Sequence, residues 1–248
     1  MSKVITLNSN DKLDLDFNSS EVITLIVDTD SPLINYNLSS GDYKILIFIK
    51  YSGDVSLNEV GTVKDSHVDI TYVELNDHMY KQNTNVDVYK DSKVFVNSIY
   101  LGINKKHIDF DLVNKEKDSE VDIVNNVVCL DASDVVLNVV GTIVNGAKRS
   151  KCHQKNHCLT VDNPKQAKVL PVLKIDENDV EASHSLSSGT IDEEVLFYMN
   201  ARGLTKKEAL NLMVLSYLLP NREKFELFET GNELYELSER KVKELCLM

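Results

Sequence analysis

The 248-residue chain contains no tryptophan and little glycine or proline, with only 9 and 4 of these residues. Globular proteins commonly hold about 7% glycine and 5% proline. The shortage excludes a low-complexity linker, and it argues against a fold of many tight hairpins, whose turns depend on these residues. A chain of this length can bury about 70–75% of its unfolded surface, so it needs no metal or disulfide to fold.

Basic residues are also scarce, since 27 Lys and Arg face 39 Asp and Glu, giving a net charge of −12. Proteins that bind nucleic acids or anionic membranes normally present a basic stripe, and the densest basic stretch here is the short segment 148–151. The longest apolar run, Ile45–Ile49, is far shorter than the roughly 20 residues of a membrane span. We therefore expect neither a nucleic-acid partner nor a membrane partner.

Secretion signals are weak in this sequence. The first residues lack the long apolar core of a signal peptide, and 4 cysteines in a chain of this size do not make a disulfide framework. These features predict a cytoplasmic protein with reduced thiols.

Alternating apolar residues run through about the first 180 positions, as expected for half-buried strands. Similar segments begin at Asp65, Asp91, Asp118 and Ala132, each with a serine next and an alternating stretch after it. The first apolar positions recur about every 13 to 14 residues, with one unit skipped near residues 79–88. They are Val55, Val68, Val94, Ile108, Val121 and Val135.

Such a short period predicts a parallel β-solenoid in which two units make a coil of about 27 residues. The valines would point inward, and the serines would fit tight corners. An antiparallel sandwich is the alternative, but Asn145-Gly146 is the only Asn-Gly hairpin signal.

The pattern becomes helical after Gly189. Capping boxes at 190–193 and 205–208 predict helices over about 191–202 and 206–219, ended by Gly203 and Pro220. A third helical region is expected from about Asn221, with a possible break at Gly231. The expected domains are a β-helix core over 1–188 and a small helical domain over 189–248.

One segment could bind a metal, because Cys152, His153, His157 and Cys158 are all suitable ligands. On a strand, however, the two cysteines share one face and the two histidines share the other. The cysteines would then be about 20 Å apart, too far to bind one ion unless the chain turns. A 27-residue coil would instead place His157 or Cys158 beside His184.

Residues 154–219 resemble the SufB/SufD subunits of the Suf iron–sulfur cluster assembly system. The resemblance rests on Ser183-His184, the small-residue turn 185–189, Leu196-Phe197-Tyr198 and Arg202-Gly203-Leu204. It implies a right-handed parallel β-helix followed by C-terminal helices, in agreement with the period.

The resemblance also implies a function without enzymatic turnover. Such a scaffold subunit docks a SufC-like ABC ATPase and pairs with a SufB-like subunit or a second copy, and a transient iron–sulfur cluster forms at the interface. Lys155 and Ser185 stand where SufB has a cysteine and a glutamate, and Ala182 stands where SufD often has a cysteine. The chain is therefore SufD-like, with His184, Cys158 and His157 as expected cluster contacts and His184, Cys158 and Cys152 as expected metal ligands.

The second helix is apolar on all sides, so something must cover it. The residues expected to bind the ATPase are Ile191, Tyr198, Arg202, Leu212, Met213 and Tyr217. Phe197, Tyr198 and Arg202 are expected to pack on the solenoid end rather than to contact a cofactor.

Two other functions stay open. One is a structural β-helix partner that has lost cluster chemistry, consistent with Lys155 and Ser185. The other is a carbohydrate-active β-helix enzyme, which would need carboxylates clustered in a groove. No nucleotide-binding, nucleophile-elbow or zinc-protease motif is present in the sequence.

Overall fold

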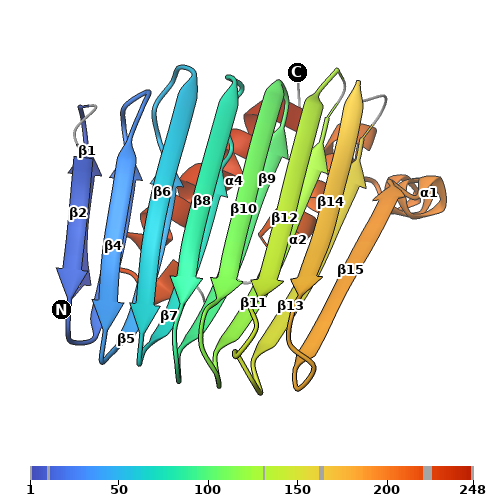
Figure 1. Ribbon diagram of the computed structural model, residues 1–248. Helices are drawn as coiled ribbons and strands as arrows, with labels where there is room; N and C mark the ends of the chain where they lie inside the picture. Colours follow the sequence, from blue (N-terminus) through green and yellow to red (C-terminus); the bar gives the residue numbers. More distant parts are fainter. Residues whose placement is uncertain (1, 10–11, 131, 162–164, 220–224, 247–248) are drawn as a thin grey trace.

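The computed structural model describes residues 2–9, 12–130, 132–161, 165–219 and 225–246, and it forms a parallel β-solenoid (Figure 1). Odd-numbered strands form an eight-stranded sheet: β1 (Ser2–Leu7), β3 (Glu21–Val27), β5 (Asp42–Ile49), β7 (His67–Glu74), β9 (Lys93–Gly102), β11 (Glu120–Cys129), β13 (Lys151–Thr160) and β15 (Glu181–Thr190). Even-numbered strands form a seven-stranded sheet: β2 (Lys12–Phe17), β4 (Leu33–Ser39), β6 (Val55–Lys64), β8 (Tyr80–Val88), β10 (Lys105–Asn114), β12 (Asp134–Ile143) and β14 (Gln166–Ile175).

Alternate side chains of both sheets fill the space between them. The six apolar positions that define the sequence period are each at most 5% exposed and belong to one core, as predicted. Neighbouring strands in both sheets pair in parallel, each with a strand of the adjacent coil, which confirms the solenoid and excludes the antiparallel sandwich.

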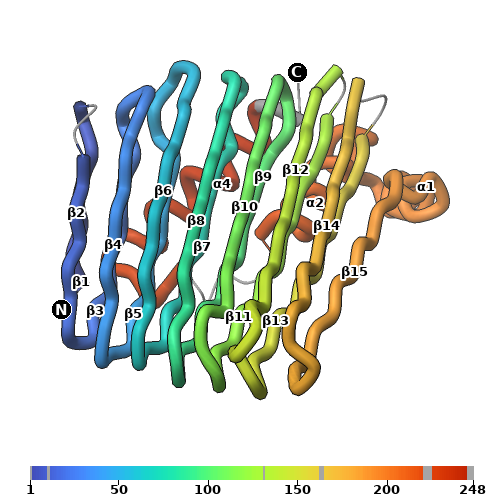
Figure 2. Tube along the Cα trace, viewed as in Figure 1, coloured from blue at the N-terminus to red at the C-terminus, as the bar shows by residue number. Residues whose placement is uncertain are grey.

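The coils lengthen along the chain, as the trace in Figure 2 shows. Hydrogen bonds between neighbouring coils join residues 21 apart at Asn35 and Asp14, 27 apart at Asn76 and Ile49, and 31 apart at Arg149 and Asp118. The expected coil of about 27 residues therefore describes only the middle of the solenoid.

Left-handed backbone at the corners explains the repeated Asp-Ser pairs. Asp65, Asp91 and Asp118 have φ of 47°, 56° and 61°, a region that aspartate tolerates better than most residues. The serine after each is buried and bonds to corner carbonyls; for example, the Ser119 hydroxyl donates to the Glu116 oxygen at 2.7 Å. The small residue predicted at each corner is thus confirmed.

The unit missing from the sequence period is strand β8. Its first three inward side chains, Tyr80, Gln82 and Thr84, are polar, whereas the last two, Val86 and Val88, belong to the apolar core. Gln82 accepts hydrogen bonds from the hydroxyls of Tyr80 and Tyr100 at 2.8 and 2.7 Å, and its amide donates to Thr84 at 2.9 Å. Thr84 donates at 3.1 Å to Glu59, which also accepts from Tyr72 at 2.5 Å. This buried network replaces the expected valines, so the strand does not follow the apolar pattern.

Three helices follow the strands in the described part of the chain: α1 (Glu193–Ala201), α2 (Lys206–Leu218) and α4 (Gly231–Cys246). Helices α2 and α4 lie over the outer face of the eight-stranded sheet (Figure 1). Their apolar side chains form a second core with outward residues of that sheet, including Val214, Leu218, Leu234, Val242, Val73, Leu101 and Val128. None of the described helices is long and apolar enough to cross a membrane.

The helix boundaries agree only in part with those predicted from the sequence. The capping box of Thr205 and Glu208 opens α2, and Gly203, with φ of 97°, follows α1, both as predicted. The capping box predicted at Thr190 is wrong, because Thr190 still belongs to β15 and the side chain of Asp192 caps α1 instead. Gly231 begins α4 after residues 227–230, which form a turn and separate it from the helical residues Phe225 and Glu226, so the expected break lies directly before Gly231. Pro220 and Asn221 lie outside the described residues.

Candidate functional site: the uncovered final coil

In the part of the chain that the structure describes, no further coil stacks on the last coil of the solenoid. Strands β14 and β15 end their sheets, so one edge of each has no strand partner among the described residues. All ten residues of β15 are exposed, including Leu186 at 45%. Ile175 on β14 is 39% exposed, although its register partner Ile143 is fully buried. A cross-section of the core, together with two backbone edges, is therefore open to solvent.

His184 lies on β15 opposite Gln154, because the coil is longer here than expected. The facing pair His153 and Ser183 is 30 residues apart, so the predicted 27-residue offset, which would place His184 beside His157, is wrong. Gln154 is buried and faces the core, so His184 stacks on the core side of the open end. Its imidazole is exposed and forms no hydrogen bond or ion pair in the described part of the chain.

The other predicted ligands lie at different distances from His184. His157 is opposite Ser187 and faces the outer side of the sheet, away from the row that contains His184. Cys158 faces inward but is four residues beyond Gln154, about 13 Å along the strand. Cys152 is two residues before Gln154 on the same side, so it is the nearest of the predicted cysteines to His184.

The thiol of Cys152 sits in a narrow part of the core. A side chain on Gly141 would come within 2.4 Å of the Cys152 sulfur and 2.9 Å of the Gln154 amide nitrogen, so both side chains depend on this glycine. Burial is the main cause, and the negative charge of Asp122 the second, that raises the pKa of Cys152 to about 12. The thiol is consequently protonated at neutral pH, and a bound metal would have to displace its proton.

Cys158 has a neighbour that the sequence reasoning did not identify. Its register partner is Val127, and the Cys129 thiol two residues further on hydrogen-bonds to the Cys158 sulfur. This bond lowers the pKa of Cys158 and raises that of Cys129. Cys158 is therefore the more readily ionised thiol of the pair. Each cysteine is the last inward-facing residue of its strand, β11 or β13. The contact could be predicted only from the correct register between these two strands.

A row of polar side chains inside the solenoid reaches the open end. Ser98 donates to Asn125, the Asn125 amide donates to Asn156 at 2.7 Å, and Asn156 donates to the Ser185 carbonyl of β15 at 3.1 Å. The Gln154 amide crosses to the Val172 carbonyl of β14 at 3.1 Å. These bonds fix the backbone of the last coil even though its side chains are exposed.

No three His, Cys, Asp or Glu side chains converge on one point among the described residues. A site built on His184 would accordingly need ligands from outside this chain, or from sulfide, to complete an iron coordination sphere.

Helix α1 buries none of its side chains. Phe197 is 75% exposed, and Tyr198 and Arg202 contact each other rather than the solenoid, with a 2.8 Å hydrogen bond. The expectation that these three residues pack on the solenoid end is wrong, because α1 lies beyond the last strand (Figure 1).

The remaining predicted docking residues divide by exposure. Leu212 of α2 is exposed on the side away from the sheet. Ile191 and Tyr217 pack against the second core, and Met213 is half-buried. Phe197, Tyr198 and Leu212 thus leave large apolar surfaces uncovered on α1 and α2.

Comparison with known proteins points to one family. The family model described as "SUF system FeS cluster assembly, SufBD core domain" matches residues 50–217. The "Iron-sulfur cluster assembly protein SufD" of Bacillus subtilis is 26% identical over 231 residues, covering 90% of this chain and 50% of that protein. An iron–sulfur cluster assembly SufBD family protein of Pyrococcus horikoshii is 33% identical over 93 residues, covering 38% of this chain and 20% of that protein. The chain spans at most about half the length of these relatives.

Proposed function

Because the chain belongs to the SufBD core family of iron–sulfur cluster assembly proteins, we propose that it is a SufD-like scaffold subunit without enzymatic turnover. The observation that carries the proposal is the uncovered final coil, whose ten β15 residues are all exposed beside a strand edge that no described strand pairs with. Such an end is completed by another β-helix, either a SufB-like subunit or a second copy. The assembly would work in the cytoplasm.

In this proposal the cluster is cargo that forms at the interface and leaves. His184 supplies one nitrogen ligand from the open end, where no hydrogen bond from the described residues competes for its ring. Cys152 lies diagonally behind it in the preceding coil, and the Cys158–Cys129 pair lies further along the same inner surface. The partner subunit or sulfide would provide the other ligands.

The ATPase is proposed to dock on α1 and the exposed side of α2. Phe197, Tyr198 and Leu212 offer apolar surface that the solenoid leaves uncovered, and exposed apolar side chains of this kind mark interaction sites. The opposite side of α2 is already occupied by the sheet.

Iron retention after anaerobic reconstitution tests the cluster role. The full chain carrying His184→Ala should be reconstituted with a SufB-like subunit and a SufC-like ATPase and compared with His153→Ala, whose ring faces the other side and bonds to Ser183. We expect His184→Ala to lower retained iron and His153→Ala to leave it unchanged. Equal iron retention in both variants, with complex assembly intact, would instead favour a structural partner without cluster chemistry.

ATPase docking needs a separate test. Phe197→Ser combined with Leu212→Ser should abolish co-purification of the ATPase, while Leu170→Ser, an exposed apolar residue on β14, should not. Retained co-purification in the double variant would contradict this assignment.

A further inference from the structure

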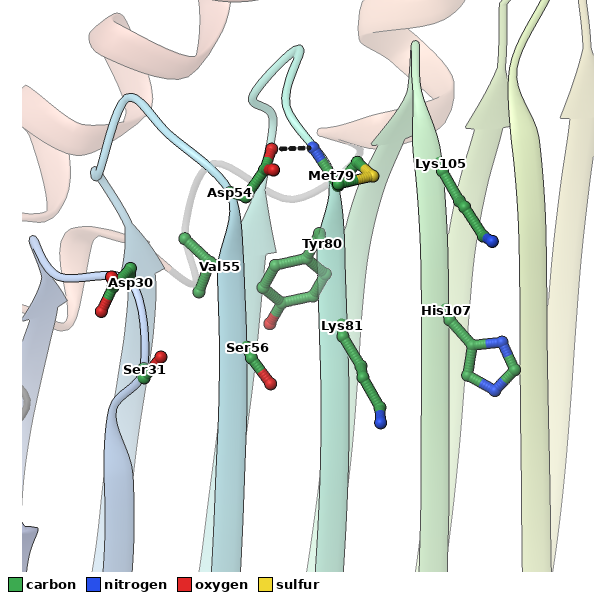
Figure 3. A pocket seen from close by; sticks show the side chains of 10 residues that line it. All are labelled: Asp30, Ser31, Asp54, Val55, Ser56, Met79, Tyr80, Lys81, Lys105 and His107. Atoms are coloured by element: carbon green, nitrogen blue, oxygen red, sulfur yellow. Dashed lines mark hydrogen bonds between the residues drawn. The ribbon is translucent and has the colours of Figure 1, made fainter.

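A second surface feature lies on the outer face of the seven-stranded sheet, away from the helices. It is a groove of about 620 Å³ at the start of strands β6, β8 and β10 and beside the loop before β4 (Figure 3). Small-molecule sites commonly occupy about 300–1,000 Å³. The buried side chains of Val55 and Tyr80 form its floor, and exposed Met79 forms a wall.

One side of the groove is cationic. Lys81 and His107 are register partners on β8 and β10, and Lys105 lies two residues before His107 on the same face. Neither lysine forms an ion pair with a carboxylate within the described ranges. The three basic side chains emerge from two neighbouring strands toward the same outer face (Figure 3). The Nε2 atom of His107 lies 3.1 Å from a carboxylate oxygen of Asp109. The positive charge without a carboxylate partner among the described residues therefore comes from Lys81 and Lys105, in a chain of net charge −12.

The other side of the groove is acidic and hydroxylic, with Asp30, Ser31, Asp54 and Ser56. One carboxylate oxygen of Asp54 accepts from the Met79 backbone at 3.0 Å, which joins this side to the wall (Figure 3). The groove therefore presents positively charged hydrogen-bond donors on one side and carboxylates that can accept hydrogen bonds from hydroxyl groups on the other.

A buried network fixes the loop that forms the Met79 wall. Lys106 and Glu74 form a 2.5 Å ion pair inside the solenoid, and Lys106 also donates to the Asn76 carbonyl at 2.9 Å. The Asn76 side chain donates to the Ile49 carbonyl at 3.2 Å and accepts from Lys241 of α4. A ligand would therefore meet a wall that is already in place, which lowers the entropic cost of binding.

We propose that this groove binds a small phosphate ester that carries hydroxyl groups. The phosphate lies against Lys81 and Lys105, because ammonium groups bind phosphate through charge-assisted hydrogen bonds. His107 lines the same side of the groove, with its Nε2 atom directed to Asp109. The hydroxyl groups donate to Asp30 and Asp54 on the opposite side. This site is independent of the proposed cluster chemistry, since it lies on another face and shares no residue with the final coil.

Titration of the full chain followed by NMR of backbone amides tests the proposal. The probes are AMP, ribose 5-phosphate and adenosine, which lacks the phosphate. We expect at least one of the two esters to give saturable shifts at residues 79–81 and 105–107, and adenosine to give none. Absence of saturable shifts with both esters, or equal binding of adenosine, would overturn the proposal.

Matched variants locate the site. Lys81→Gln combined with Lys105→Gln should weaken ester binding at least about tenfold, because two charge-assisted contacts are lost. Lys168→Gln combined with Lys174→Gln removes the same charge from exposed positions of β14 in the same sheet and should leave binding unchanged. Equal affinities in the two double variants would contradict the assignment.

Discussion

The closed coils are covered on both sides by neighbouring coils, whereas the final coil is covered on one side only by the described residues. Leu137 on β12 is fully buried between β10 and β14, whereas Leu186 on β15 is 45% exposed. In a solenoid each coil contacts only its neighbours, so stability is approximately a sum over adjacent coils. Among the described residues, the final coil has such a neighbour on one side only, which is why we propose that a partner covers the other side.

The largest expected effect comes from the closed coils, where Lys106 and Glu74 are buried as an ion pair. Lys106→Met should lower the free energy of unfolding by about 3–5 kcal/mol, because it leaves Glu74 buried without a counter-charge. Urea denaturation measures the loss. The neighbouring exposed substitution Lys105→Met should change the free energy by less than about 0.5 kcal/mol, and similar losses for the two would contradict the assignment.

A leucine in each region gives the most direct contrast. Leu137→Ala should cost about 2–5 kcal/mol of unfolding free energy, because it opens a cavity in a closed coil. Leu186→Ala in the isolated chain should cost less than about 1 kcal/mol, because its side chain already meets water. Equal costs in urea denaturation would mean that the final coil is covered in solution.

The buried carboxyl of Glu59 makes the closed coils sensitive to pH. Burial raises the pKa of Glu59 from 4.5 to about 7, despite hydrogen bonds from Tyr72 and Thr84 that favour the charged form. The folded state thus binds this proton more tightly than the unfolded state does. The contribution of protonated Glu59 to the free energy of unfolding is fully present below pH 4.5 and is lost as the pH rises to about 7.

Between these two pH values, Glu59 should lower the free energy of unfolding by about 3 kcal/mol. The neutral variant Glu59→Gln should therefore lack this part of the pH dependence, as measured by urea denaturation between pH 4.5 and 8. Glu181→Gln, an exposed carboxylate of the final coil, serves as the control and should follow the wild-type profile. A wild-type profile for Glu59→Gln would contradict the role of its burial.

The sequence predicted the features that depend on local contacts. The Asp-Ser corners recur because the same left-handed turn is needed before successive strands, and Thr205 with Glu208 caps α2 within four residues. The run Ile45–Ile49, which is too short for a membrane span, is a buried part of β5. It is continuous because Leu46 and Phe48 are covered by the helix core, while Ile45, Ile47 and Ile49 fill the solenoid.

Contacts between coils were harder to predict because they depend on loop lengths. The segment between β13 and β14, residues 161–165, is longer than the corresponding segment between β9 and β10, residues 103–104, so Gln154 rather than His157 faces His184. The long segment between β12 and β13, residues 144–150, shifts the register of β11 and β13 and hides the Cys129–Cys158 contact from any argument based on a fixed period. Strand β8 was missed because Gln82 and Thr84 stabilise it through hydrogen bonds instead of apolar burial.

The most direct test of the central claim is the molar mass in solution, measured by light scattering with and without a SufB-like subunit. The wild-type chain should pair with itself or with that subunit, and Leu186→Asp at the final coil should be monomeric under both conditions. Val4→Asp, which places the same charge at a 42% exposed position on β1 at the opposite end, should pair as the wild type does. A wild-type chain that stays monomeric at high concentration under both conditions, or a Leu186→Asp variant that pairs normally, would contradict the claim that the final coil is the partner-binding end.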